Sequence, residues 1–525
     1  MKTSLSRRWR VLIRRHGPTS PLWRRRIAMG TGAVSIGLAA LFFARVADGA
    51  NDLFLRLVAS ICWIPLVMTP LGFAGIAWAT RRFAPEAAGS GIPQVIAAAH
   101  DPDRAVPMLI SLKAAAIKFT LTIAALLCGA SVGREGPTVQ ISAAILSWHH
   151  RFFRAPLRAS MIIAGGAAGV AAAFNTPLAG VTFAIEELAD AYEQRVALLV
   201  MTTILIAGMV SLGLAGDYVY FGEVGEHLKV GAVLRIAPVA GVLGGLSGGL
   251  FARLLLSMGA MRARWLPTLA NRPILWALGC GVIVGTLGVV THLTWGTGYS
   301  SARQIIDGTN APYWFGPAKF ATTLATAASG MPGGIFAPSL ATGAGLGALL
   351  RPMFPGDPGG AVVLLGMVAY FTGVVRAPLT AVIIIVEATA SRGLILPLFL
   401  AALIAHAVSA LVCKERLYHG LSKPWREALR GGEPQRHRPR LIEPWLRLTA
   451  SWCGVCSSGP LVAPIFPLTN CAFATLASAR RHLGPRSNDD RRDIIAALRR
   501  VRPAIQCAST RASGGWYGSG AKAPS

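Results

Sequence analysis

Long apolar stretches, separated by short polar ones, follow one another along most of this chain. A helix needs roughly 20 apolar residues to cross the hydrocarbon core of a bilayer. Several stretches exceed that length and contain Gly and Pro, so a single straight helix does not account for them. We therefore predict an all-α polytopic membrane protein with broken and re-entrant helices, whose apolar stretches lie near 27–48, 55–80, 105–130, 158–189, 196–215, 233–256, 273–293, 317–350, 360–375 and 378–413.

A polar connecting stretch, 216–232, divides the membrane region into two halves of similar length, 27–215 and 233–420. Each half contains Gly-rich apolar segments that Pro interrupts. Paired discontinuous segments in two halves are typical of an inverted-repeat transporter with its site at the bilayer midplane. The flanking segments differ in composition: 1–26 is basic, and 421–525 is rich in Arg, Pro, Ser and Gly. We expect the latter to be a flexible cytoplasmic tail.

Composition agrees with a membrane protein. The chain is 53% hydrophobic and 14% charged, whereas soluble chains carry about a quarter charged residues. Its net charge of +28 is concentrated in the two tails; the first 26 residues hold nine Lys or Arg and no Asp or Glu. Basic tails are typical of nucleic-acid or headgroup binding, or simply of the positive-inside rule. The second interpretation places the chain in a cell inner membrane with both termini in the cytoplasm. There the termini contact anionic lipid and not nucleic acid.

The sequence gives little support for a metal site or for a protease active site. Cys453 and Cys456 form a lone C-x-x-C, which is a weak zinc signal without a second pair at a matching distance. No H-E-x-x-H motif is present. Ser90 stands in an Ala-Gly-Ser-Gly context, but no later span offers a convincing His partner for a serine protease. We expect no enzyme activity, no metal and no cofactor.

Three short Gly-Pro motifs carry the strongest functional signal. Glycine and proline break a helix and leave backbone N–H groups at membrane depth without intrahelical partners. Several such donors that converge on one point bind a small anion without a full positive charge in lipid. The motifs are Gly89-Ser90-Gly91-Ile92-Pro93, Gly133-Arg134-Glu135-Gly136-Pro137 and Gly334-Ile335-Phe336-Ala337-Pro338.

The charged pair Arg134-Glu135 has two interpretations. It is either a local ion pair that closes a helix end or part of a transport pathway, because charges at membrane depth are expensive. In the second interpretation the Glu135 carboxylate occupies the anion site at a helix N-terminus and leaves it when protonated. One residue then acts as gate and as proton carrier.

The remaining candidates each have a structural alternative. The Ser90 hydroxyl either donates to an anion or caps a turn. Ile335 and Phe336 either direct their N–H groups along a pathway or pack in the core. Glu186 and Glu187 are either a solvated cap or a cytoplasmic proton-uptake point. Tyr418 either presents its hydroxyl to an anion or belongs to an interfacial aromatic belt.

Taken together, these segments resemble the CLC family of chloride channels and transporters in its bacterial form, over about residues 27–420. The three signatures occur in the order and spacing of that family. Further matching stretches are Ala84-Pro85-Glu86-Ala87, Lys118 ahead of Arg134, 174–187, 296–299 and 374–381.

The resemblance implies a homodimer in which each subunit has its own pore, built from two inverted halves. By motif match, the chloride-binding residues are Ser90, Ile335, Phe336 and Tyr418. Glu135 is the external gating glutamate and Glu187 the internal proton-transfer residue. The supporting residues are Gly89, Gly91, Arg134, Gly136 and Lys118.

Our leading hypothesis is therefore a proton/chloride antiporter. The alternative is a passive voltage-gated chloride channel of the same fold. Glu187 distinguishes the two, because passive members of the family usually carry an apolar residue there.

Overall fold

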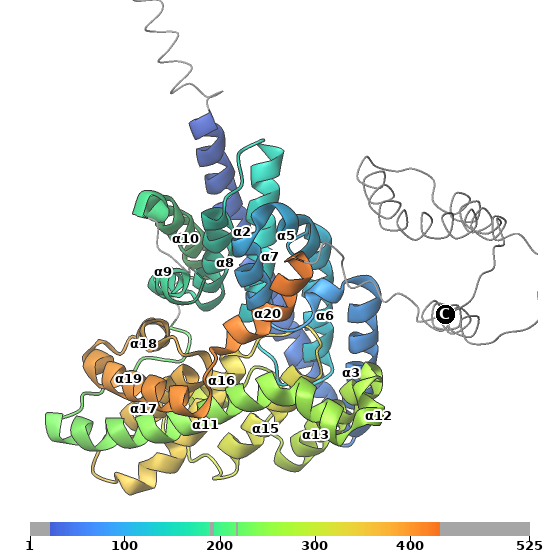
Figure 1. The fold of residues 1–525 in the computed structure, drawn as a ribbon. Coiled ribbons are helices and arrows are strands. Elements are labelled where there is room, and N and C mark those ends of the chain that lie inside the picture. The colour runs from blue at the N-terminus through green and yellow to red at the C-terminus, as the bar shows by residue number, and fades with distance from the viewer. Residues whose placement is uncertain (1–20, 189–193, 217–218, 431–525) are drawn as a thin grey trace, which may run out of the picture. The chain divides into compact units, whose positions relative to one another are not determined.

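The computed structural model describes residues 21–188, 194–216 and 219–430, and these residues form helices joined by short connections (Figure 1). In the first half they are α2 (Pro21–Ser60), α3 (Pro65–Phe83), α4 (Ile92–His100), α5 (Pro102–Leu109), α6 (Leu112–Leu127), α7 (Glu135–Phe152), α8 (Ala159–Phe174), α9 (Pro177–Phe183) with a π-helical turn (Ala184–Leu188), and α10 (Gln194–Ala215). The second half contains α11 (Val230–Trp265), α12 (Pro267–Ala270), α13 (Pro273–Thr291), α14 (Tyr299–Ile306), α15 (Phe315–Ala328), α16 (Phe336–Leu350), α17 (Gly359–Val375), α18 (Pro378–Thr389), α19 (Ile395–Val412) and α20 (Leu417–Arg430). Single 3-10 turns cover Pro85–Ala87, Arg351–Met353 and Arg392–Leu394.

Few of the described helices are long enough to cross a membrane alone. Four single helices are apolar and long enough, and α5 with α6 forms a fifth span bent by 44°. The other predicted stretches are broken. The stretch 158–189 divides at Asn175, where φ is 57°, and Pro177 then begins α9. The stretch 317–350 divides into α15 and α16 around Gly330, where φ is 77°. The prediction of broken helices is confirmed.

The two halves repeat the same packing scheme. In the first half α2 packs against α8 and α10, and α7 packs against α8. In the second half α11 packs against α17 and α19, and α16 packs against α17. α8 and α17 both end at a left-handed residue, Asn175 and Arg376, and both are followed by a helix that begins with Pro. Figure 1 shows α7, α8 and α10 in one group and α11, α17 and α19 in another.

Small residues let the broken helices approach closely. A side chain at Gly347 would collide with the Val363 backbone, and one at Gly343 would collide with Met367. These positions join α16 to α17. In a bilayer, where no hydrophobic force drives helices together, such close contacts are the main source of association. They fix α16, and with it the third motif.

Candidate anion site

Backbone hydrogen bonds join the three Gly-Pro motifs. Gly133 and Gly334 exchange a pair of N–H···O bonds, each 2.8 Å, as an isolated antiparallel bridge. The N–H of Gly333 donates to the carbonyl of Gly89 at 3.1 Å, and the N–H of Gly89 donates to Met331 at 3.2 Å. Loops that lie more than two hundred residues apart in the chain therefore form one unit.

Each motif opens a helix, so three helix N-termini meet at this unit. α4 begins at Ile92, α7 at Glu135 and α16 at Phe336. The first N–H groups of each helix have no intrahelical partner. They carry partial positive charge toward the common point. Proline in the first turn of each helix removes a donor that the helix could not use and fixes φ for the turn.

A cavity of about 230 Å³ lies against the first and third motifs. Ser90 and Tyr418 both line it, and their hydroxyls approach each other. Neither hydroxyl makes a hydrogen bond of normal geometry, although Ser90 is 8% exposed and Tyr418 is fully buried. A buried hydroxyl without a partner is costly unless something else accepts its proton. Both donors are therefore available to an anion in this cavity, which Gly89, Gly334 and Ile335 also line.

Glu135, the first residue of α7, is fully buried. The N–H groups of Glu135 itself and of Ala337 approach its carboxylate, yet neither carboxylate oxygen has a partner with hydrogen-bond geometry. A side chain at Gly133 would collide with the Glu135 carboxylate, and one at Gly136 with the Ser90 hydroxyl. The glycines of this motif thus leave room for the two groups predicted to handle the anion and the proton.

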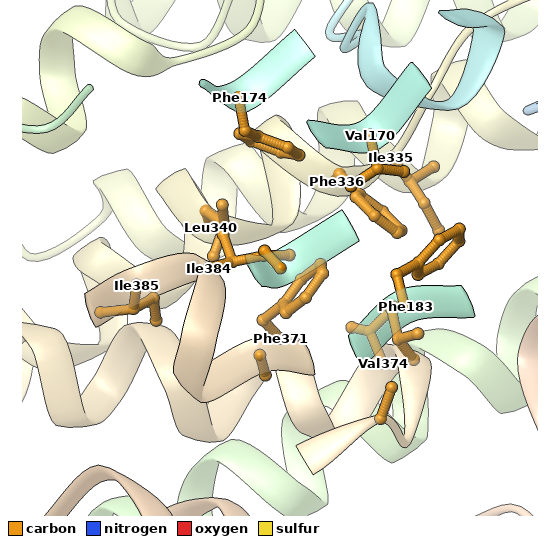
Figure 2. Close-up of a cluster of buried hydrophobic side chains, with 14 of the residues drawn as sticks. Val170, Phe174, Phe183, Ile335, Phe336, Leu340, Phe371, Val374, Ile384 and Ile385 are labelled. Atoms are coloured by element: carbon orange, nitrogen blue, oxygen red, sulfur yellow. The ribbon is translucent and has the colours of Figure 1, made fainter. Parts of the chain in front are cut away.

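Ile335 and Phe336 have different surroundings. Ile335 lines the cavity. The Phe336 ring lies in an aromatic cluster, with ring centroids 5.0 Å from Phe371, 5.8 Å from Phe183 and 5.9 Å from Tyr418. Figure 2 shows Phe336 between Phe174 and Phe183, with Ile335 beside it. The packing interpretation is confirmed for the Phe336 ring. Phe336 is also the first residue of α16, and the role of its N–H in a pathway stays a prediction.

Two buried lysines hold the loops around the site. The Lys118 ammonium on α6 donates to the carbonyls of Ala87 at 3.0 Å and Gly89 at 2.9 Å. Lys319 occupies the equivalent place on α15, and its ammonium donates to Thr294 at 2.9 Å and to Gly296 at 2.8 Å. Both lysines are fully buried. The sequence analysis included Lys118 and missed Lys319, whose only signal was a charge within an apolar stretch.

The adjacent acids Glu186 and Glu187 differ in their hydrogen bonding. Glu186 accepts hydrogen bonds from the backbone of Leu379 and Thr380 and from the Thr380 hydroxyl, at 3.2, 2.8 and 2.8 Å. It therefore caps the start of α18. Glu187 is 1% exposed, and neither of its carboxylate oxygens has a hydrogen-bond partner. The interpretation of this pair as a solvated cap is thus wrong for Glu187, since the fold buries it.

The cap on α18 has a counterpart on α9. Glu387, near the end of α18, accepts from the N–H groups of Leu178 and Ala179 at 3.2 and 2.8 Å. Each half thus supplies a carboxylate that accepts hydrogen bonds from the first N–H groups of a helix in the other half: Glu186 caps α18 and Glu387 caps α9. Sequence analysis missed this exchange, because nothing in the local pattern connects residues about two hundred positions apart.

Arg134 does not line this cavity. Its guanidinium forms a 2.7 Å ion pair with Asp48 and donates to the carbonyl of Ala44 at 2.8 Å. It lines a second cavity of about 460 Å³ together with Asp48, Asn51 and Tyr299. The alternative of a local Arg134–Glu135 pair that closes a helix is not observed, since Asp48 is the ion-pair partner of Arg134.

Tyr418 does not lie at the end of the last span. α19 ends at Val412, and Tyr418 stands in the first turn of a separate helix, α20, which continues to Arg430. The first ten residues of the segment 421–525 are therefore helical. The rest of that segment, including Cys453 and Cys456, lies outside the described residues.

Helix N-termini that meet beside a cavity, in an apolar two-fold repeat, define a membrane transport protein. The chain matches the family described as voltage gated chloride channel over residues 72–410. Curated relatives from Vibrio cholerae serotype O1 strains, described as the H(+)/Cl(-) exchange transporter ClcA, are 33% identical over 381 residues, which cover 68% of this chain and 78% of theirs. The chain belongs to this family, the CLC family, as the motifs predicted.

Solved structures confirm the fold. A slow cyanobacterial Cl⁻/H⁺ antiporter superposes with a TM-score of 0.68 at 23% identity, covering 77% of this chain and 98% of that one. A CLC-type fluoride/proton antiporter superposes with a TM-score of 0.62 at 22% identity, covering 74% and 96%. The protein is a multi-pass, all-α membrane protein with the CLC fold.

Proposed function

We propose that the chain is a proton-coupled chloride antiporter that uses no metal or cofactor and catalyses no covalent chemistry. The observation that carries the proposal is the cavity beside the first and third motifs, which the hydroxyls of Ser90 and Tyr418 line without a hydrogen bond of normal geometry. An anion in this cavity can accept hydrogen bonds from the Ser90 and Tyr418 hydroxyls. The names of the relatives, which specify exchange of H⁺ and Cl⁻, support the same proposal.

Coupling follows from competition for one electropositive place. The Glu135 carboxylate lies where the N-termini of α7 and α16 approach each other. While ionised, it is favoured there by the helix ends and keeps the anion out. Protonation removes that attraction and lets the anion enter. Glu135 then exchanges its proton with the outside and Glu187 with the inside.

The test uses Glu135→Gln, which keeps the shape of the side chain and removes its titration. In liposomes containing the purified variant, we expect chloride efflux to continue while chloride-driven proton uptake disappears. Wild-type protein is the reference in both assays. Chloride-driven proton uptake that persists in Glu135→Gln would contradict the mechanism.

The second candidate is the passive voltage-gated channel, favoured by the description of the family. The two differ in their reversal potential under a pH gradient, which protons shift in an antiporter and leave unchanged in a channel. Glu187, buried without a hydrogen-bond partner, favours the antiporter, because a pore for chloride alone has no use for a buried acid.

Assembly and orientation are also proposals. Apolar side chains stand exposed on α9, α10, α18 and α19, which pack in series; among them Met209 is 66% exposed and Leu403 57%. We propose that a second copy covers this face to form a homodimer with one pore per subunit, in an inner membrane with both termini cytoplasmic. Crosslinking through cysteines placed at these two positions tests the dimer.

A further inference from the structure

One histidine beside the buried internal acid belongs to no motif. His419 follows Tyr418 in the first turn of α20. Its Nε2 lies 4.0 Å from Oε1 of Glu187. The Glu187 side chain is fully enclosed, whereas the His419 side chain is 27% exposed. The imidazole therefore spans the distance between a sealed carboxylate and solvent.

The surroundings restrict the other routes for a proton. Glu186, the adjacent acid, is occupied as the cap of α18 by three hydrogen bonds. Arg416 donates to the backbone carbonyls of Glu186 and Arg376, at 3.3 and 3.4 Å. Guanidinium groups hold their protons at every physiological pH and do not relay them. Among these neighbours, histidine alone changes charge near neutral pH at its ordinary pKa.

Charged and titratable groups surround the pair on several helices. Glu186, Arg376 and Arg416 act on Glu187 through their charges, and Glu187 acts on Tyr418. His406 on α19 lies near the same two arginines, and Lys423, one turn after His419 on α20, pairs with Glu415 at 2.5 Å. Arg376 and Arg416 favour the carboxylate form of Glu187.

We propose that His419 is the proton relay between the cytoplasmic solution and Glu187. This inference rests on the proposed antiport. His419 takes a proton from water, and its Nε2–H bond then breaks as an O–H bond forms at Oε1 of Glu187. The imidazole returns to the neutral form and takes up the next proton. A shift of about 1 Å brings the two atoms from 4.0 Å to hydrogen-bond distance.

The experiment compares His419→Gln with wild type in liposomes, over a series of pH values on the side that α20 faces. We expect proton flux to fall about tenfold, since a positioned acid–base group contributes at least that much. Chloride flux remains within about twofold, because His419 does not line the anion cavity. The dependence of proton flux on pH at that side flattens, while its dependence on the opposite side is unchanged.

His406→Gln is the matched control, because His406 lies near the same two arginines but not within ion-pair distance of Glu187. Its proton flux should equal that of wild type. In His419→Ala, imidazole added to the buffer should restore proton flux, which a purely structural role would not allow.

Wild-type coupling and pH dependence in His419→Gln would overturn the role of His419 and leave the antiport intact. An equal loss of chloride and proton flux without imidazole rescue would also overturn it. If wild-type protein itself moved no protons, the proposed antiport would fail, and that outcome is separate from the other two.

Discussion

Gly136, in the second motif, packs directly against Ser90 in the first motif. A methyl group added at Gly136 therefore tests the arrangement of the site. A Cβ at this position would collide with the Ser90 hydroxyl and would lie 3.0 Å from the Ser90 carbonyl oxygen and 3.1 Å from Cα of Gly334. The last two contacts are with backbone, and Gly334 is fixed by its bridge to Gly133. In Gly136→Ala the flexible hydroxyl must therefore turn away.

The magnitude follows from what the hydroxyl does. A hydrogen bond to a charged group contributes about 1.5–3 kcal/mol, which corresponds to roughly a 10- to 150-fold weaker chloride affinity when it is lost. The crowding itself destabilises the fold by about 1–3 kcal/mol. We expect titration calorimetry in detergent to show the first effect and thermal unfolding to show the second.

Gly75→Ala on α3 is the control, since a Cβ there has no atom within 4 Å. It should bind chloride as wild type does and unfold at the same temperature or slightly higher, because alanine favours helix over glycine. If Gly136→Ala bound chloride with wild-type affinity, the hydroxyl of Ser90 would not be a ligand, and the reasoning from the cavity would be refuted.

Two further predictions concern the contacts between distant segments. Glu387→Gln leaves one donor at the start of α9 poorly satisfied and should lower stability by about 1–2 kcal/mol, measured by thermal unfolding; Glu427→Gln, on an exposed position of α20, should have no effect, and equal loss in both variants would count against the cap. Lys319→Met leaves the carbonyls after α13 without their donor and should destabilise by about 1–3 kcal/mol. Unchanged melting would mean that relief of the buried charge offsets the lost hydrogen bonds.

The three motifs could be recognised from sequence because their chemistry is local. Glycine and proline break a helix wherever they stand, and a proline in the first turn marks where the next helix starts. Ser90, Glu135 and Ile335 were thereby placed at helix starts before any tertiary contact was known. The buried state of Glu187 was not predicted, because a pair of acids after an apolar stretch has the same local pattern whether solvent reaches it or not.

Contacts between segments far apart in the chain were beyond sequence reasoning. The Gly133–Gly334 bridge, the exchange of Glu186 and Glu387 between helices, and the approach of His419 to Glu187 all join residues about two hundred positions apart. No periodicity in either segment encodes its partner. The same holds for Tyr418, whose place at the cavity depends on how α20 folds back against α4.

By itself, the sequence determined that the chain enters a bilayer, where its helices break, and which residue types stand at the breaks. Burial of apolar side chains and the steric limits of glycine and proline act within a few residues, so the order of residues is enough to specify them. Only the tertiary structure decided which broken ends meet and which acid is sealed from solvent. Those outcomes depend on backbone hydrogen bonds and close packing between the two halves, and such forces act only once the chain has folded.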